Sequence, residues 1–210
     1  MTKQEIIDRI RANFPQELQE LDQWVCWKYE QRKGEEKPTK VPYDALRPGD
    51  RAESDNPSTW ATFDRACVAY MKGVYDGIGF VFNENDPYAG VDFDHCVTAG
   101  AIDPGKAIHM KALDSYSEFS PSGTGVHVIV RGAIPGPRRK SVEHKIEMYD
   151  NVRIFTVTGG ILPDCPRTIN DCQQQLKDLY VAIFPAPKEQ RPPALTQPIK
   201  PSNIINPFAH

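Results

Sequence analysis

Two aspartates stand one residue apart in the segment GVDFD at positions 90–94. Because side chains alternate between the faces of a strand, Asp92 and Asp94 should project from one face while Val91 and Phe93 point into the core. Paired carboxylates on a rigid strand suit hard divalent cations, which bridge phosphates and stabilise the attacking and leaving oxygens of an in-line displacement. The simpler alternative is a strand end that carries two solvated acids.

A second segment, SGTGVHVIV at 122–130, places glycines and hydroxyls directly before an expected strand. Ser122, Gly123 and Gly125 can form a tight loop that turns backbone N–H groups toward phosphate oxygens. Valines occupy one face of the following strand, so His127 points to the other face, where its imidazole can donate to a triphosphate. A plain glycine turn followed by an exposed histidine would fit the same pattern.

A third segment carries another acid between apolar residues, Glu147 in IEMYD at 146–150. Its setting repeats that of the first acidic strand. Asp150 stands at an expected turn, where an aspartate commonly accepts from nearby backbone N–H groups. Both acids stay open as the third carboxylate of a site, and Glu147 is favoured. Arg153 is a candidate contact to a phosphate or a template, or else a solvated arginine on an edge strand.

Helical and strand patterns surround these segments. Thr2 and Glu5 match a capping box for an amphipathic helix over 2–13, and 30–58 is predicted to be rich in loops. Further helices are predicted from Pro57 to Gly73, over 104–114 and over 168–183. The predicted strands are 24–29, 78–82, 89–94, 116–119, 126–131, 145–149 and 153–158. The last two are expected to pair as a hairpin closed near Asp150.

Composition and charge set outer limits on the class of protein. The chain has 210 residues, of which 40% are hydrophobic, enough for one substantial domain. Its net charge of −3 leaves nucleic-acid binding open, because the location of charge matters more than its total. The start is charged and there is no long apolar run, so a cytoplasmic protein without a membrane segment is predicted. Five scattered cysteines without a CxxC pair indicate reduced thiols.

The proline content changes near residue 185. Residues 1–184 are predicted to form one domain, and 185–210 a proline-rich linker or tail, because this stretch has no helical or strand period. Basic residues gather at Arg138, Arg139 and Lys140, which could follow a template backbone, and at Lys37 and Lys40 in the loop-rich stretch. Solvated basic loops are the simpler interpretation of both.

In this order, the three segments resemble the motifs of the archaeo-eukaryotic primase superfamily: a strand with DxD, a glycine loop before a strand histidine, and a strand with a third acid. The resemblance is closest to the primase-polymerase domains of phage and plasmid replication proteins. It extends over roughly residues 20–162 and includes the stretches WVCWKYE, KPTKVPYD and NPSTW. It implies an α/β (α+β) fold with an RRM-like antiparallel-sheet catalytic half, a smaller αβ N-terminal half and an active-site cleft between them.

The resemblance also implies an activity and a set of site residues. The activity is template-directed transfer of a nucleoside monophosphate from a (d)NTP to a 3′-hydroxyl, on a single-stranded DNA template with a primer. A helicase domain or partner is expected beyond the linker. Mg²⁺ or Mn²⁺ would be held by Asp92, Asp94 and Glu147. The incoming nucleotide would be held by Ser122, Gly123, Gly125, His127 and Arg153.

Two other function classes use similar residues. A non-catalytic module that binds single-stranded nucleic acid would place aromatic side chains on its exposed sheet face, and its acids would be incidental. A metal-dependent nuclease or replication initiator could also use paired acids and a histidine. Initiators of that kind usually show two histidines around one apolar residue, whereas Val128 and Ile129 follow His127. The strand alternation therefore favours the nucleotidyltransferase.

Overall fold

The computed structural model describes residues 1–34 and 37–184, and the predicted linker at 185–210 lies outside the described residues. The helices are α1 (Lys3–Asn13), α2 (Gln16–Gln19), the 3-10 helix η1 (Pro57–Thr59), α3 (Phe63–Lys72), α4 (Pro104–Leu113) and α5 (Gln173–Ile183). The strands are β1 (Trp24–Glu30), β2 (Thr39–Tyr43), β3 (Gly77–Phe82), β4 (Tyr88–Phe93), β5 (Val97–Thr98), β6 (Ala101–Ile102), β7 (Ser117–Phe119), β8 (Val126–Arg131), β9 (Lys140–Ser141), β10 (Ile146–Tyr149) and β11 (Arg153–Thr156). Helices combined with antiparallel strands confirm the α+β class.

Most strands belong to two antiparallel sheets. Sheet A has the order β11-β3-β1-β2, and sheet B has the order β7-β8-β4-β10-β9. The short strands β5 and β6 pair with each other. Sheet A is built from the N-terminal half of the chain except for β11, which comes from far along the sequence. The two halves of the fold are therefore interleaved at this strand.

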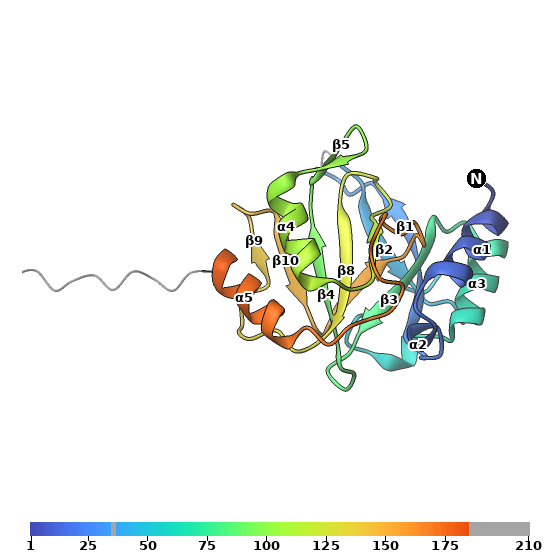
Figure 1. Ribbon diagram of the computed structural model, residues 1–210. Coiled ribbons are helices and arrows are strands. Elements are labelled where there is room, and N and C mark those ends of the chain that lie inside the picture. Colours follow the sequence, from blue (N-terminus) through green and yellow to red (C-terminus); the bar gives the residue numbers. More distant parts are fainter. Residues whose placement is uncertain (35–36, 185–210) are drawn as a thin grey trace, which may run out of the picture.

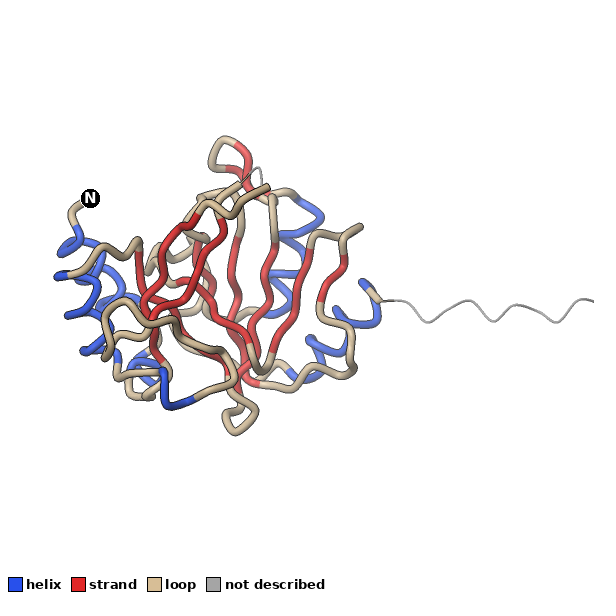
Figure 2. The backbone as a smooth tube through the Cα atoms, turned by 180° about the vertical axis from the view of Figure 1, so that it is seen from behind, coloured by secondary structure: helices blue, strands red, loops and turns tan. Residues whose placement is uncertain are grey.

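Each sheet buries one face against helices. The core of sheet A includes Ile10 of α1 and Phe63 of α3, and that of sheet B includes Met110 of α4 and Leu176 of α5. Figure 1 shows α4 and α5 on one flank of the molecule and α1, α2 and α3 on the other. From behind, the strands of both sheets form one curved surface between these flanks (Figure 2). The described helices include none that is long and apolar enough to span a membrane.

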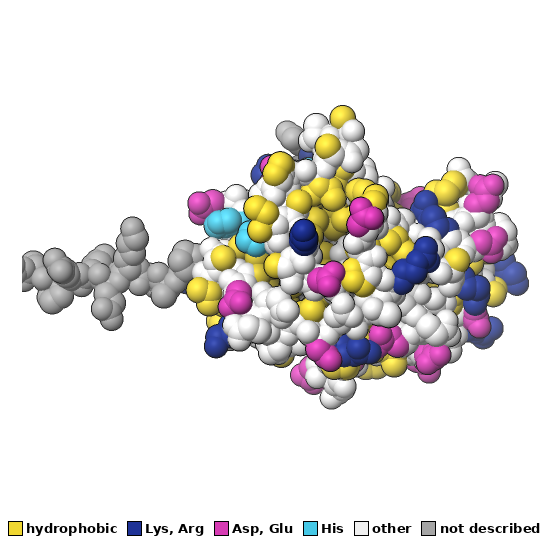
Figure 3. Space-filling model, viewed as in Figure 1, with side chains coloured by type: hydrophobic (Ala, Val, Ile, Leu, Met, Phe, Trp, Pro, Cys, Tyr) yellow, Lys and Arg dark blue, Asp and Glu magenta, His cyan; other side chains and the backbone are white. Residues whose placement is uncertain are grey.

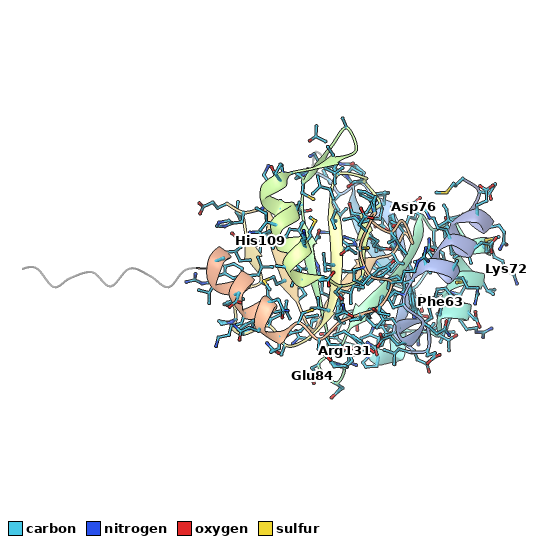
Figure 4. All side chains as sticks on the ribbon, viewed as in Figure 1. Phe63, Lys72, Asp76, Glu84, His109 and Arg131 are labelled. Carbon is cyan, nitrogen blue, oxygen red and sulfur yellow. The ribbon has the colours of Figure 1, made fainter. Side chains whose placement is uncertain are left out.

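A polar contact joins the two halves at the ends of β4 and β8. Arg131, at the lower edge of the sheets in Figure 4, forms an ion pair with Glu17 of α2. The hydroxyl of Tyr88 donates to the same carboxylate at 2.6 Å, and the Arg131 guanidinium donates to the Ile169 carbonyl at 2.8 Å. This contact fixes α2 against sheet B at the edge of the molecule.

Several predicted elements match the structure, and two helices are shorter than predicted. The Thr2 hydroxyl caps α1 and Glu5 completes the capping box. The helix expected from Pro57 is split, because Ala61 pairs with Trp24 of β1 through two backbone hydrogen bonds of 2.8 and 3.0 Å. Likewise α5 begins only at Gln173, since the preceding residues donate to and accept from the backbone of β8 and its neighbours.

The loop-rich segment 30–58 also contains the edge strand β2 at residues 39–43, which was not predicted. One further prediction was wrong. The strands β10 and β11 do not pair as a hairpin: β10 pairs with β4 and β9, whereas β11 crosses to β3. The crossing carries the chain from sheet B to sheet A within a few residues. It brings Arg153, the first residue of β11, beside the acid of β10.

Candidate active site

A row of polar side chains crosses sheet B on the face turned away from α4 and α5. The strand register places Glu118 opposite His127, His127 opposite Asp92, Asp92 opposite Glu147, and Glu147 opposite Lys140. Directly opposed residues share a face and lie close together. The apolar neighbours on these strands belong to the core beneath the helices. Asp92 therefore sits at the centre of a row contributed by five strands.

A cavity of about 410 Å³ opens between the two sheets at this row. Asp92 and His127 line it from sheet B, and residues of β1, β2 and β11 line it from sheet A. Its lining residues are Trp27, Thr39, Lys40, Pro42, Ser54, Asp92, His127, Val152, Arg153, Ile154, Phe155 and Thr156. A cleft between the two halves was expected, and the structure contains one.

The Asp92 carboxylate is crowded by other acids. Burial raises the pKa of Asp92 to about 7, and the charges of Asp94 and Glu147 act in the same direction, while Arg153 and Lys40 oppose them. Within the part of the chain that the structure describes, no donor reaches this carboxylate within hydrogen-bonding distance. A buried carboxylate with no donor and with acidic neighbours is stabilised in its ionised form by a bound cation. The oxygen donors at Asp92 therefore fit a divalent metal.

Glu147 is already paired with cations. Its carboxylate forms ion pairs with Lys140 and, at 2.7 Å, with Arg153, and it accepts from the Tyr149 hydroxyl at 2.9 Å. Burial would raise the pKa of Glu147, but these hydrogen bonds and charges hold it below its usual value. Among residues 1–34 and 37–184, no three His, Cys, Asp or Glu side chains converge as a ready metal cluster. Glu147 can reach a metal at Asp92 through a remaining lone pair of its carboxylate or by releasing one of these cations.

The alternative third acid, Asp150, lies outside the row. Its carboxylate accepts from the backbone N–H of Ile134 at 2.8 Å and from the Arg139 guanidinium at 3.1 Å. These partners fix the connection between β10 and β11 to the loop before β9. Asp94 follows β4 directly, and its backbone N–H donates to the Lys145 carbonyl at 2.9 Å. Of the two open acids, Glu147 is the one that faces Asp92.

The predicted phosphate loop is a network of hydroxyls. The Ser122 hydroxyl lies 3.1 Å from that of Ser120 and 2.9 Å from that of Thr124, and the Gly125 N–H donates to Ser120 Oγ at 3.2 Å. Gly123 has φ +72°, which favours glycine. A Cβ on Gly125 would lie 3.0 Å from the Phe93 carbonyl oxygen, so this glycine permits the loop to pass beside the end of β4. Ser120, which sequence reasoning missed, anchors the loop.

This loop lies beside the acidic strand and outside the cavity wall. Of the described residues, Ser122, Gly123 and Gly125 do not line the cavity between the sheets. The N–H groups of Gly123, Thr124 and Gly125 are bonded within the loop itself. The close approach at Phe93 places the loop next to Asp94, the residue that directly follows β4. Its hydroxyls are therefore its available polar groups in this conformation.

His127 is buried rather than exposed. Its ring stacks on Phe155 at a centroid distance of 4.6 Å, and its Nε2 lies 3.8 Å from Asp92 Oδ1. Burial lowers the pKa of His127 to about 3, and the charges of Lys40 and Arg153 add to this effect. The ring is therefore neutral around pH 7. The alternative of an exposed strand histidine does not hold.

Lys40 is the main site residue whose role sequence reasoning did not predict. It lies on β2, donates from Nζ to the Thr156 hydroxyl at 3.1 Å, and lies 5.6 Å from the centroid of the Trp27 ring. Burial lowers the pKa of Lys40, whereas Asp92 and Asp94 raise it. The alternation in TKVPY at 39–43 was the available signal for a strand at this position.

Comparison with known proteins gives one curated relative. No family model matches the chain. The chain is 30% identical over 182 residues to a protein named DNA primase-polymerase from Nitratiruptor phage NrS-1. This similarity relates the chain to a phage primase-polymerase. It covers 80% of this chain and 22% of the phage protein, so the chain spans about a fifth of the length of that relative.

Proposed function

We propose that this chain carries the nucleotide-transfer site of a primase-polymerase, which adds (d)NTPs to a 3′-hydroxyl on a single-stranded DNA template. The observation that supports this most strongly is the position of Asp92. It lies between His127 and Glu147 in the row. It also lines a cavity to which Lys40 and Arg153 contribute positive charge. Acids for a metal and cations for phosphates in one cavity are what phosphoryl transfer requires.

The acids would hold Mg²⁺ or Mn²⁺. Asp92, Asp94 and Glu147 are the proposed ligands, and the bound ions would neutralise charge on the phosphates and on the attacking and leaving oxygens. We expect Glu147 to exchange one of its two cations, Lys140 or Arg153, for this interaction. The released cation would remain beside the cavity, where it could bind a phosphate oxygen of the nucleotide.

The remaining residues would bind and orient the triphosphate. Lys40 and Arg153 approach the cavity from sheet A, and His127 faces it from sheet B with Nε2 on the side of Asp92. The hydroxyls of the loop at 120–125 continue the polar surface past the end of β4. Together these groups would hold the reacting phosphate next to the carboxylates, and this positioning is the main contribution of protein to such reactions.

A non-catalytic strand-binding module is less consistent with this arrangement. Such a module would place aromatic side chains along its open sheet face, but at the cavity sheet B presents Asp92, flanked in the row by His127 and Glu147. These acids would repel a phosphate backbone without metal ions. Figure 3 shows the opposite, helix-covered side of the molecule, where the described lysines and arginines are interspersed with acids.

Labelled-nucleotide incorporation tests the proposal. The protein is incubated with a primed single-stranded DNA template and each of the four dNTPs or NTPs, with Mg²⁺, Mn²⁺ or EDTA. We expect metal-dependent addition of the nucleotide complementary to the template. Asp92→Asn should abolish it, whereas Asp178→Asn, at an exposed position on α5, should not. Incorporation that ignores the template base, or that survives in Asp92→Asn, would refute the proposal.

A further inference from the structure

Glu118 on β7 is a buried acid for which the proposed nucleotide site has no role. It is 1% exposed, and its carboxylate accepts from the Tyr116 hydroxyl at 2.9 Å and from the backbone N–H groups of Thr158 and Gly159 at 3.1 and 2.7 Å. Burial raises the pKa of Glu118 to about 7, and these three donors act against that rise by favouring the ionised form. The carboxylate is thus fixed in place on several sides.

His127 lies between this acid and Asp92. Its Nδ1 lies 4.0 Å from Glu118 Oε1, and its Nε2 lies 3.8 Å from Asp92 Oδ1. Among the described residues, Nδ1 of His127 is the buried side-chain nitrogen or oxygen that lacks a hydrogen-bond partner. A buried polar atom without a partner is costly, and Glu118 is the carboxylate nearest to Nδ1.

We propose that Glu118 is a positioning residue for His127. The Glu118 carboxylate accepts a hydrogen bond from Nδ1–H of the ring and so keeps Nε2 facing the cavity. The consequence for the nucleotide rests on the proposed function. In a neutral imidazole one nitrogen carries the proton, and the hydrogen bond made by that nitrogen decides which one it is. The present separation of 4.0 Å between Nδ1 and Glu118 Oε1 must shorten by about 1 Å for this hydrogen bond to form.

The anchoring of Glu118 explains why the ring would adjust and the acid would not. Thr158 and Gly159 follow β11, the strand whose Phe155 stacks on the His127 ring. The Glu118 carboxylate therefore binds the backbone that directly follows β11, the strand on whose Phe155 the His127 ring stacks.

One other group competes for the ring. The backbone of Thr156 also interacts with His127, and it acts to raise its pKa. If the Thr156 carbonyl accepted the ring proton, Glu118 would have only a structural role. The two assignments predict different His127 tautomers after the charge of Glu118 is removed.

The test is the tautomer of His127 in the ligand-free protein, measured by long-range ¹H–¹⁵N correlation at pH 8. We expect the proton on Nδ1, with the downfield position of a proton bonded to a carboxylate. Glu118→Gln should move the ring toward the Nε2–H tautomer. Tyr116→Phe should not, because it removes a donor from Glu118 and leaves the carboxylate in place. A proton on Nε2 in the wild type, or an unchanged tautomer in Glu118→Gln, would overturn the proposal.

If Glu118→Gln does not fold, the wild-type spectrum alone decides between Glu118 and the Thr156 carbonyl as the acceptor. A carbonyl acceptor leaves the ring proton upfield of the position that a carboxylate produces, and that result would assign the contact to Thr156. In the incorporation assay, Glu118→Gln should raise the KM for the nucleotide about tenfold with a smaller change in kcat. A rise in KM without a change of tautomer contradicts the positioning role. Absence of incorporation by the wild type would refute the proposed function and leave the tautomer result standing.

Discussion

Replacing Asp92 with asparagine should stabilise the ligand-free protein at alkaline pH while it abolishes nucleotide transfer. Burial, together with Asp94 and Glu147, raises the pKa of Asp92 from 3.8 to about 7. That rise corresponds to about 4 kcal/mol against the ionised carboxylate in the folded state. Asparagine keeps the size of the side chain and removes the charge. The substitution should therefore recover up to about 4 kcal/mol wherever the wild-type carboxyl is ionised.

The pH dependence follows from the direction of the pKa change. The folded state holds the proton of Asp92 more tightly than the unfolded chain, so the destabilisation is absent below about pH 4 and grows as the pH rises to about 7. It is complete above that value. In urea unfolding with EDTA, Asp92→Asn should match the wild type near pH 4 and exceed it in free energy of unfolding at pH 8. Asp178→Asn, at an exposed position on α5, should show no such trend.

A metal reverses the comparison. Mn²⁺ that binds the folded wild type and not the variant should raise the stability of the wild type at pH 8 with increasing concentration. Asp92→Asn should not respond. Two results would refute this account of Asp92 as an acid destabilised by burial and by its acidic neighbours. One is a variant less stable than the wild type at pH 8 without metal, and the other is a difference in free energy of unfolding that stays constant between pH 4 and 8.

Three further predictions concern the cavity and its surroundings. Lys40→Met should raise the KM for the nucleotide about tenfold, because it removes a half-buried cation from the cavity wall, whereas Lys37→Met at an exposed position should leave it unchanged in the same assay. Glu147→Gln should lower turnover about a hundredfold, roughly 2.7 kcal/mol, and Asp150→Asn should have little effect on turnover; the opposite ranking would move the third acid to Asp150. Gly125→Ala should lower the free energy of unfolding by about 1–3 kcal/mol in urea, because its Cβ would lie 3.0 Å from the Phe93 carbonyl oxygen; an unchanged stability would show that the loop gives way.

The core of the site could be predicted because it depends on local alternation. Asp92, His127 and Glu147 each stand between apolar residues on a strand, so the sequence itself assigns them to the face opposite the core. The register that sets them side by side depends on pairing between strands far apart in sequence. That pairing was not visible in the spacing, although the order of the three motifs was consistent with it.

The missed features depend on tertiary context. Pro42 made the stretch around Lys40 look like a loop, but proline is tolerated in β2 because β2 is an edge strand of sheet A. The crossing of β11 to sheet A could not be distinguished from a hairpin, because both need only a short connection after β10. Two of the partners of Glu118 are N–H groups of residues about forty positions away, and this long-range contact had no local signature in the sequence.

The position of bound manganese tests the central claim most directly. A crystal of the protein with Mn²⁺ and a non-hydrolysable nucleoside triphosphate would show the metal by its anomalous scattering. We predict a peak within about 2.5 Å of the Asp92 carboxylate, with the triphosphate beside Lys40 and with Glu147 released from Lys140 or Arg153. A nucleotide and metal bound elsewhere, with the cavity at Asp92 empty, would contradict the account.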